Sequence, residues 1–396
     1  MKVVVQKFGG TSVANVDRVQ NIVKYVRSEI NSGYVVVVVV SAMAGVTSSL
    51  LSLCRDIAGV QGIPLSSEFD TVIHSGEIVT AGLTALALLQ HGIKARSFCG
   101  WQVPITTNVS YGAAFIENIN QETLLDCLRN NVVPVVSGFQ GVTLGNRITT
   151  LGRGGSDVTA AAIGAILSAH RVDIYTDVSG VYTTDPRLCQ SAKQIAAISQ
   201  EHMLQLSIAG AKVLHPRSIE IAKRYNVTMR VISSFKPDAI TTITVGECVN
   251  MESTKIVGIT SNKNLCRISI TSDQKHESAD IIARMSQDNI VFNEVYCSAN
   301  NIEMILEREY VQHVEKALSG ITHQIFYDVG TITIVGFGLQ HDSALVLRIM
   351  RLVTKHDFIV NAFYQSNIKI VLLVTGSGLE LLQKELHETL FNNNNA

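Results

Sequence analysis

The chain has 396 residues, with 32 Lys and Arg against 33 Asp and Glu, and a formal net charge of −1. This length exceeds what one ordinary hydrophobic core accommodates, so we expect two or three domains. The balanced charge leaves no basic surplus for a general nucleic-acid partner or an anionic membrane surface. Hydrophobic residues make up 46% of the chain and charged ones 16%, which is enough apolar side chain for a large sheet buried on both faces.

The apolar runs and the cysteines favour a cytoplasmic protein without a membrane span. A charge interrupts the N-terminal run MKVVVQKFGG before a signal-peptide core can form, and no later run reaches bilayer length. The seven cysteines are scattered without Cys-x-x-Cys pairs, so neither a disulfide framework nor a zinc site is indicated. We therefore expect a reducing compartment and no metal held by a protein cluster.

From Met1 to about Val245, short β-branched runs alternate with helical stretches. The strand-like runs are VVVQKF, YVVVVVVS, VVPVVSGF, RITTL and VDIYTD. Such alternation predicts crossover connections and a largely parallel sheet with helices on both faces. Ligands then bind at the carboxyl ends of the strands.

After Met251 the rhythm changes to an internal repeat. Ile268 to Ile270 precede the segments ESADIIARMSQD, VFNEVYCS, IEMILE and VQHVEKAL, and Ile332 to Ile334 open a second copy in the same order. We predict two β-α-β-β-α units, each too small for a comfortable core of its own, which pair with each other or with another subunit.

The first candidate binding loop is Lys7-Phe8-Gly9-Gly10-Thr11-Ser12, between a predicted strand and a predicted helix. Paired glycines let backbone N–H groups approach a phosphate, and the helix N-terminus adds a favourable dipole. The lysine precedes the glycines, unlike in a Walker A loop. The alternative is a plain strand-to-helix turn capped by Ser12.

A second loop, Gly152 to Asp157, has the sequence GRGGSD and stands before the helical VTAAAIGAILSA. Arg153 among three glycines suits a carboxylate or a phosphate, and Asp157 could orient Lys7. A glycine-rich turn capped by Ser156 or Asp157 explains the same letters. A third loop, Tyr175 to Arg187, has hydroxyls, acids and aromatic rings suited to a nucleotide, although turn chemistry explains its Gly and Asp-Pro equally well.

Eight motifs together resemble the aspartate kinases in order and spacing, over essentially the whole chain. They are KFGGTS, the Val-rich strand ending in Ser41-Ala42-Met43, SGE, GWQ, SGFQG, TTLGRGGSD, YTDVSGVYTTDPR and GAKVLHPR. The resemblance implies a three-layer α/β/α amino-acid kinase domain over residues 1–250 and two ACT-like, ferredoxin-like α+β units over 251–325 and 326–396. It also implies a homodimer or larger assembly.

The resemblance implies a role for each matching residue. Lys7 and Asp157 are the expected catalytic pair. Aspartate is expected to meet Ser41, Thr47, Glu77, Arg153 and Ser156, with Glu77 on its ammonium group and Arg153 on its α-carboxylate. The nucleotide is expected to meet Lys7, Gly9, Gly10, Ser12, Thr176, Asp177, Tyr182, Asp185, Arg187 and Lys212.

The resemblance implies phosphoryl transfer from ATP to the β-carboxylate of aspartate. The chemistry of that reaction explains why no catalytic histidine stands out. The side chain of aspartate has a reference pKa of about 3.9, so the nucleophile is already an anion at neutral pH and needs no general base. With ATP as the phosphoryl donor and Mg²⁺ as its companion ion, catalysis then consists of holding two anions together and neutralising charge on the moving phosphoryl group. We expect Mg²⁺ to be held by phosphate oxygens and water. His74, beside SGE, is expected to pack or orient rather than to act as a base.

The resemblance further implies the first step of lysine, threonine and methionine biosynthesis, with lysine or threonine as an effector at the ACT interface. The ACT-like units depart from the family pattern, because Thr271 to Ser278 lack its Pro-Gly and Asn293 and Asn361 replace its acid. We expect weakened lysine inhibition or a changed effector. Met251 resembles an internal start for a separate small subunit, and an ordinary linker methionine is the alternative.

Two other classes of function remain open. Kinases for acetylglutamate, glutamate, UMP or carbamate share the fold, but they are not expected to combine KFGGTS with TTLGRGGSD. A non-catalytic amino-acid sensor would keep the ACT pair without turnover. The presence of Lys7, Glu77, Arg153 and Asp157 argues against the sensor.

Overall fold

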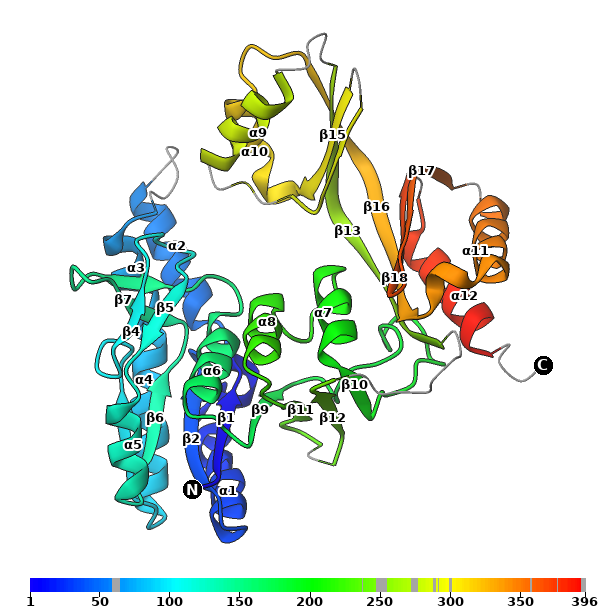
Figure 1. The fold of residues 1–396 in the computed structure, drawn as a ribbon. Coiled ribbons are helices and arrows are strands. Elements are labelled where there is room, and N and C mark those ends of the chain that lie inside the picture. The colour runs from blue at the N-terminus through cyan, green and yellow to red at the C-terminus, as the bar shows by residue number, and fades with distance from the viewer. Residues whose placement is uncertain are drawn as a thin grey trace. The chain divides into compact units, whose positions relative to one another are not determined.

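The computed structural model divides the chain into two compact units. It describes residues 1–58, 65–236, 238–246, 255–271, 277–287, 290, 292–298, 301–356, 358–375 and 377–392 (Figure 1). Unit 1 consists of Met1–Val181, Gln194–Ser207 and Lys212–Val249, and unit 2 of Tyr182–Lys193, Ile208–Ala211 and Asn250–Ala396.

Unit 1 is built on an eight-stranded sheet in the order β10-β12-β11-β9-β1-β2-β6-β3. Its strands are β1 (Val3–Phe8), β2 (Val35–Val40), β3 (Ala95–Phe98), β6 (Val133–Ser137), β9 (Arg171–Thr176), β10 (Ala197–Ser199), β11 (Met229–Ser233) and β12 (Ile240–Thr244). All neighbouring strands run parallel except β11 and β12. The predicted mainly parallel sheet is confirmed.

Helices cover both faces of this sheet because successive residues of a strand point to opposite sides. The helices are α1 (Val16–Asn31), α2 (Val46–Ala58), α3 (Ser67–Ile73), α4 (Ser75–Gln90), α5 (Glu122–Arg129), α6 (Gly155–Ile166), α7 (Gln200–Ile208) and α8 (Pro216–Arg224). On one face α1 and α4 pack against Val36, Val38 and Val40 of β2. Lys7 of β1 points the other way and contacts α6.

One predicted strand lies outside the main sheet. The run RITTL forms β8 (Ile148–Thr150), which pairs antiparallel with β7 (Gln140–Val142) in a separate sheet. The order of that sheet is β5-β4-β7-β8, with β4 (Ile105–Thr107) and β5 (Ile116–Ile119). The expectation that RITTL belongs to the large sheet was wrong, since a short hydrophobic run does not reveal its partner strand.

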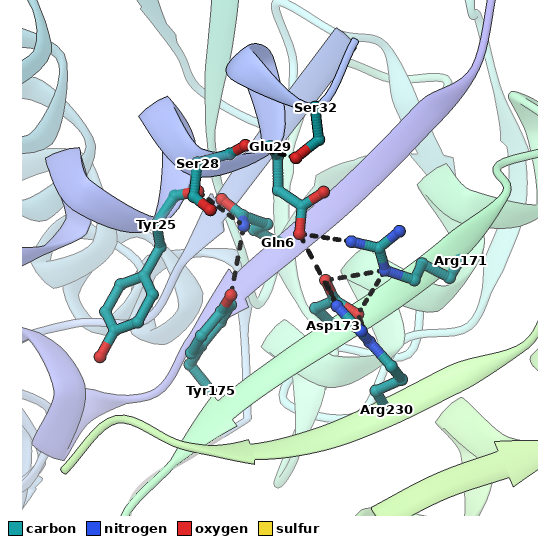
Figure 2. Close-up of polar contacts among 9 residues, drawn as sticks. All are labelled: Gln6, Tyr25, Ser28, Glu29, Ser32, Arg171, Asp173, Tyr175 and Arg230. Carbon is teal, nitrogen blue, oxygen red and sulfur yellow. Dashed lines mark hydrogen bonds and ion pairs between the residues drawn. The ribbon is translucent and has the colours of Figure 1, made fainter. Parts of the chain in front are cut away.

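A buried ion network fastens α1 to β9 and β11 (Figure 2). Asp173 is fully buried and accepts hydrogen bonds from Arg230 Nε and Nη2, both at 2.7 Å, and from Arg171 Nε at 3.2 Å. Glu29 of α1 pairs with Arg171. The charges are tolerable inside the protein because each lies against an opposite charge.

One helical stretch is long and apolar enough to span a membrane, although no run of bilayer length was expected from the sequence. Residues Ser67–Gln90 span 24 residues, and an 18-residue window within them has a mean hydropathy of 1.6, so the stretch is long and apolar enough by composition to cross a membrane. In the structure 56% of that window is buried inside the protein, where α4 packs on β3 and β6. The stretch is apolar because it serves as a core helix of unit 1.

Unit 2 contains the repeat, joined into one antiparallel sheet of order β14-β15-β13-β16-β18-β17. Its elements are β13 (Lys255–Thr271), α9 (Glu277–Gln287), β14 (Glu294–Cys297), β15 (Asn301–Glu307), α10 (Val311–Ala317), β16 (His323–Phe337), α11 (Ser343–Lys355), β17 (Ile359–Gln365), β18 (Lys369–Thr375) and α12 (Leu379–Asn392). Figure 1 shows β13 and β16 as two long strands side by side.

The two repeats therefore pair with each other, as predicted, and share their longest strands. One apolar core lies under α9 and α10, and another lies under α11 and α12. The expected boundary between residues 325 and 326 falls inside β16. Because the repeats share one sheet, their two small cores are joined through its strands. This offsets the small size of each repeat.

Candidate active site

A cavity of about 300 Å³ lies at the carboxyl edge of the large sheet of unit 1. Parallel strands present their carboxyl ends at the same edge, so loops distant in sequence meet there. The lining residues come from the loops after β1 and β2, from the start of α4 and from the start of α6. They are Lys7, Gly10, Ser41–Gly45, Thr47, Glu77, Phe139 and Gly152–Asp157.

Lys7 and Asp157 form an ion pair in this cavity. Lys7 Nζ lies 2.7 Å from Asp157 Oδ1, and the two side chains are 10% and 12% exposed. Asp157 stands in the first turn of α6, where the helix dipole favours a negative charge. The pair holds the lysine ammonium at a fixed position on the cavity wall.

Glu77 brings a second carboxylate to the cavity from the first turn of α4. Its Oε1 accepts a hydrogen bond from the backbone N–H of Ala42 at 2.9 Å, while its buried Oε2 has no hydrogen-bond partner among the described residues. Burial raises the pKa of Glu77 to about 7, against the opposing effects of hydrogen bonds and of Lys7. An unpaired buried oxygen of this kind suits a cationic group of a ligand.

The loop of Arg153 needs glycines on both sides. Gly152 and Gly154 have φ values of 75° and 69°, in the left-handed region where a side chain is strained. A Cβ at Gly154 would come within 2.4 Å of His215 Cβ. The glycines let the chain turn sharply into α6, and Arg153 stands exposed at the cavity wall.

The phosphate-side loop is fixed to β9 by its backbone. Gly9 N–H donates to the Tyr175 carbonyl at 3.0 Å, and Ser12 Oγ donates to the same carbonyl at 3.2 Å. Ser12 Oγ also contacts Ser234 Oγ at 3.0 Å. The Ser12 hydroxyl thus has structural partners, and of the predicted group Lys7 and Gly10 line the cavity.

The remaining predicted nucleotide residues lie elsewhere than the cavity lining. Thr176 is the last residue of β9 and Asp177 follows it, at the same edge of the sheet. Tyr182, Asp185 and Arg187 belong to unit 2, where Arg187 Nη2 bonds Asp185 Oδ2 at 2.6 Å. Lys212 is exposed in unit 1. Their contact with a nucleotide stays a prediction.

His74 has the orienting geometry expected of it. The ring is buried, and its Nδ1 lies 2.9 Å from the carbonyl oxygen of Asp70, one helical turn earlier. Burial lowers the pKa of His74, which keeps the ring neutral at physiological pH. The residue contacts the edge of Trp101 and does not line the cavity.

Sequence reasoning missed Asp70, a fully buried carboxylate that does not line the cavity. It also missed Phe139, which lines the cavity, and the Ala42 N–H that holds Glu77. A backbone donor leaves no trace in the sequence. Asp70 has one weak signal, since it lies seven residues before Glu77 in the segment that leads into SGE.

The fold agrees with comparisons to known proteins. Residues 2–233 match the amino acid kinase family. An aspartokinase of Rickettsia felis is 41% identical, over 99% of this chain and 98% of its own length. An aspartokinase of Geobacillus stearothermophilus is 36% identical, over 98% and 97%.

Two solved structures extend the likeness to three dimensions. E. coli aspartokinase III in complex with lysine and aspartate (T-state) is 25% identical with a TM-score of 0.74, over 99% of this chain and 100% of that one. The same enzyme in complex with aspartate and ADP (R-state) is 24% identical with a TM-score of 0.85, over 98% and 100%. At 24% identity, the likeness to the complex with aspartate and ADP shows the fold alone.

Proposed function

Because the chain belongs to the aspartokinases, ATP-dependent aspartate kinases of the amino acid kinase family, we propose that the cavity of unit 1 transfers a phosphoryl group to the β-carboxylate of L-aspartate. The observation that carries the proposal is the arrangement of charges on one cavity wall. An ion-paired lysine faces a glutamate with an unbonded carboxylate oxygen, and an arginine stands on the adjoining loop.

Each charge fits one part of the two substrates. Glu77 Oε2 would accept the ammonium group of aspartate, which supplies the partner this buried oxygen lacks. Arg153 would take the α-carboxylate with its forked donors. Lys7, steadied by Asp157, would face the transferring phosphoryl group.

The reaction needs no general base from the protein. A β-carboxylate oxygen of aspartate forms a bond to the γ-phosphorus of ATP, the bond from that phosphorus to the bridging oxygen breaks, and ADP leaves with the electron pair. No proton is transferred, because the nucleophile is ionised at neutral pH. The neutral, enclosed His74 is consistent with a site that uses no base.

Mg²⁺ fits this site as a partner of the nucleotide. Within the described part of the chain, no three His, Cys, Asp or Glu side chains gather into a metal site. Mg²⁺ dehydrates reluctantly and commonly binds through phosphate oxygens and water. When bound, it would neutralise charge on the phosphates of ATP.

ADP release with aspartate and MgATP tests the proposal, with hydroxylamine present to trap the acyl phosphate as aspartyl hydroxamate. We expect hydroxamate in an amount equal to ADP, and a loss of both in Lys7→Ala with circular dichroism unchanged. ADP without hydroxamate would point to another acceptor. Binding of both substrates without any ADP would favour a sensor.

Regulation and cellular role form the outer part of the proposal. Unit 2 would serve as an ACT-type effector unit within a homodimer or larger assembly, and the product would feed lysine, threonine and methionine biosynthesis in the cytoplasm. The free thiols of the six described cysteines are compatible with that compartment.

The altered effector contacts support a changed effector response in unit 2. Asn361 Oδ1 accepts from Arg267 Nη1 at 3.2 Å, and its amide donates to Thr375 Oγ1 at 2.6 Å. The side chain is thus neutral and already engaged. Residues 272–276, part of the first departing loop, and Met251 lie outside the described residues.

A further inference from the structure

We propose that Asp70, outside the cavity, is a positioning residue for aspartate, because it ties the loop of Arg153 to the helix that carries Glu77. The inference rests on the proposed function, in which these two residues hold the substrate. It concerns the alignment of the two binding groups and adds no new contact with substrate.

Asp70 is fully enclosed, and its carboxylate accepts hydrogen bonds from three donors. Thr150 Oγ1 donates to Oδ1 at 2.7 Å, and Thr150 N–H donates to Oδ2 at 2.8 Å. Gly112 N–H lies 3.1 Å from both oxygens. Both carboxylate oxygens therefore accept hydrogen bonds from two segments far from Asp70 in sequence, those of Gly112 and Thr150.

These two segments form the support of the Arg153 loop. Thr150 ends β8 and stands three residues before Arg153. Its carbonyl accepts the N–H of Ala114 at 2.8 Å, next to the Gly112 turn. Gly152 packs so closely on that turn that an added Cβ would lie 3.1 Å from the Gly112 carbonyl oxygen. The carboxylate of Asp70 thus clamps both sides of the Arg153 loop base.

The backbone of Asp70 connects the clamp to Glu77. Its carbonyl accepts the backbone N–H of His74 at 3.1 Å and faces His74 Nδ1 at 2.9 Å. His74 joins α3 to α4, and its own carbonyl accepts from Gln140 Nε2 at 3.2 Å. Glu77 stands in the next turn, so the two binding groups share a rigid frame through one residue.

A charged residue at this buried position carries a desolvation cost. Burial raises the pKa of Asp70, and within the described residues its carboxylate hydrogen bonds come from neutral donors. An apolar pairing in the same place would avoid that cost. Asparagine keeps the shape but turns an N–H₂ group toward the backbone N–H of either Thr150 or Gly112, and because a backbone N–H cannot accept, that contact is weakened.

The test compares Asp70→Asn with Thr150→Val, which removes the hydroxyl donor and keeps the N–H. We expect the KM for aspartate to rise about tenfold in Asp70→Asn and less in Thr150→Val, since one hydrogen bond to a charged group corresponds to roughly that factor. The KM for ATP should stay within about twofold. Leu124→Ala, at a fully buried position of α5, is the control that is expected to lower thermal stability alone.

A structural role alone would lower the melting temperature of both variants, as in Leu124→Ala, and leave the KM for aspartate unchanged, which would overturn the inference. If Asp70→Asn does not fold, Thr150→Val decides the matter. Glu77→Gln and Arg153→Ala separate the two proposals. If the KM for aspartate is unchanged in both Glu77→Gln and Arg153→Ala, the assigned site itself is refuted. If the KM rises in those two variants but not in Asp70→Asn and Thr150→Val, only the positioning role is refuted.

Discussion

Lys7 at the end of β1 and Asp157 at the start of α6 meet with 2.7 Å between Nζ and Oδ1, and both side chains are almost entirely enclosed. The pair joins a strand to the helix that follows the glycine-rich loop. It places a cation at the cavity wall without letting the long lysine side chain sample other rotamers, which is the preorganisation that charge stabilisation requires.

Asp157→Asn should therefore lower kcat about a hundredfold, comparable to the loss of one oriented electrostatic group in other enzymes. The fold should persist, because asparagine is close in shape. Steady-state kinetics with saturating aspartate and MgATP measures the effect, and circular dichroism checks the fold. Activity within about twofold of the parent would show that Lys7 needs no such partner.

Aspartate binding near neutral pH should release protons. The free protein holds Glu77 with a pKa raised to about 7 by burial, so a large fraction of the carboxyl is protonated at pH 6.5. The ammonium of aspartate favours the ionised form and expels the proton. Calorimetry in two buffers of different ionisation enthalpy measures the release, and Glu77→Gln should abolish it. Equal heats in both buffers for the parent would contradict this role.

Glu77 should also destabilise the free protein above its pKa. Its folded pKa of about 7 exceeds the ordinary glutamate value of 4.5, so the native state binds more protons between these two pH values and stability falls as pH rises through them. Glu77→Gln should then unfold at higher denaturant concentration at pH 8, with a gain of up to about 3 kcal/mol. The contribution that the parent loses with rising pH is fully present below pH 4.5.

The network around Asp173 predicts a different outcome, in stability alone. Figure 2 shows Glu29 as the second carboxylate beside Arg171 and Arg230. Asp173→Asn would leave the two arginines facing each other with Glu29 as the carboxylate that remains among the residues drawn. Breaking a buried ion pair on one side costs about 3–5 kcal/mol. Urea unfolding should show that loss, while the KM for aspartate per folded molecule stays unchanged. A raised KM without a stability loss would assign the network to the site.

Effector titration addresses unit 2. Because Asn361 is neutral and already hydrogen bonded, an amino-acid ammonium has no carboxylate to meet at this position. We expect weak inhibition by lysine alone in assays with lysine, threonine and both together. Asn361→Asp is the matched variant and should strengthen the response. Complete inhibition of the parent by sub-millimolar lysine would disprove the expectation.

Several features of the fold could be predicted because they depend on local sequence. The alternation of β-branched runs with helices predicted the parallel sheet, and the duplicated pattern after Met251 predicted two paired repeats. The glycines flanking Arg153 indicated a sharp turn, and their positive φ values confirm it. Other features could not be predicted, since the run RITTL looks the same whether its partner is β7 or a strand of the large sheet.

By itself, the sequence determined the family, the layered architecture, and several of the loops that line the cavity, because turn glycines, strand periodicity and motif order are local properties of a chain. The sequence already led us to expect Asp157 beside Lys7, and the structure adds the 2.7 Å contact between them. Only the tertiary structure decided that one Glu77 oxygen lacks a partner among the described residues, and that Asp70 clamps Thr150 and Gly112. Those relationships join segments far apart in sequence. Packing and burial set them, and burial also sets the protonation of Glu77, which no local pattern encodes.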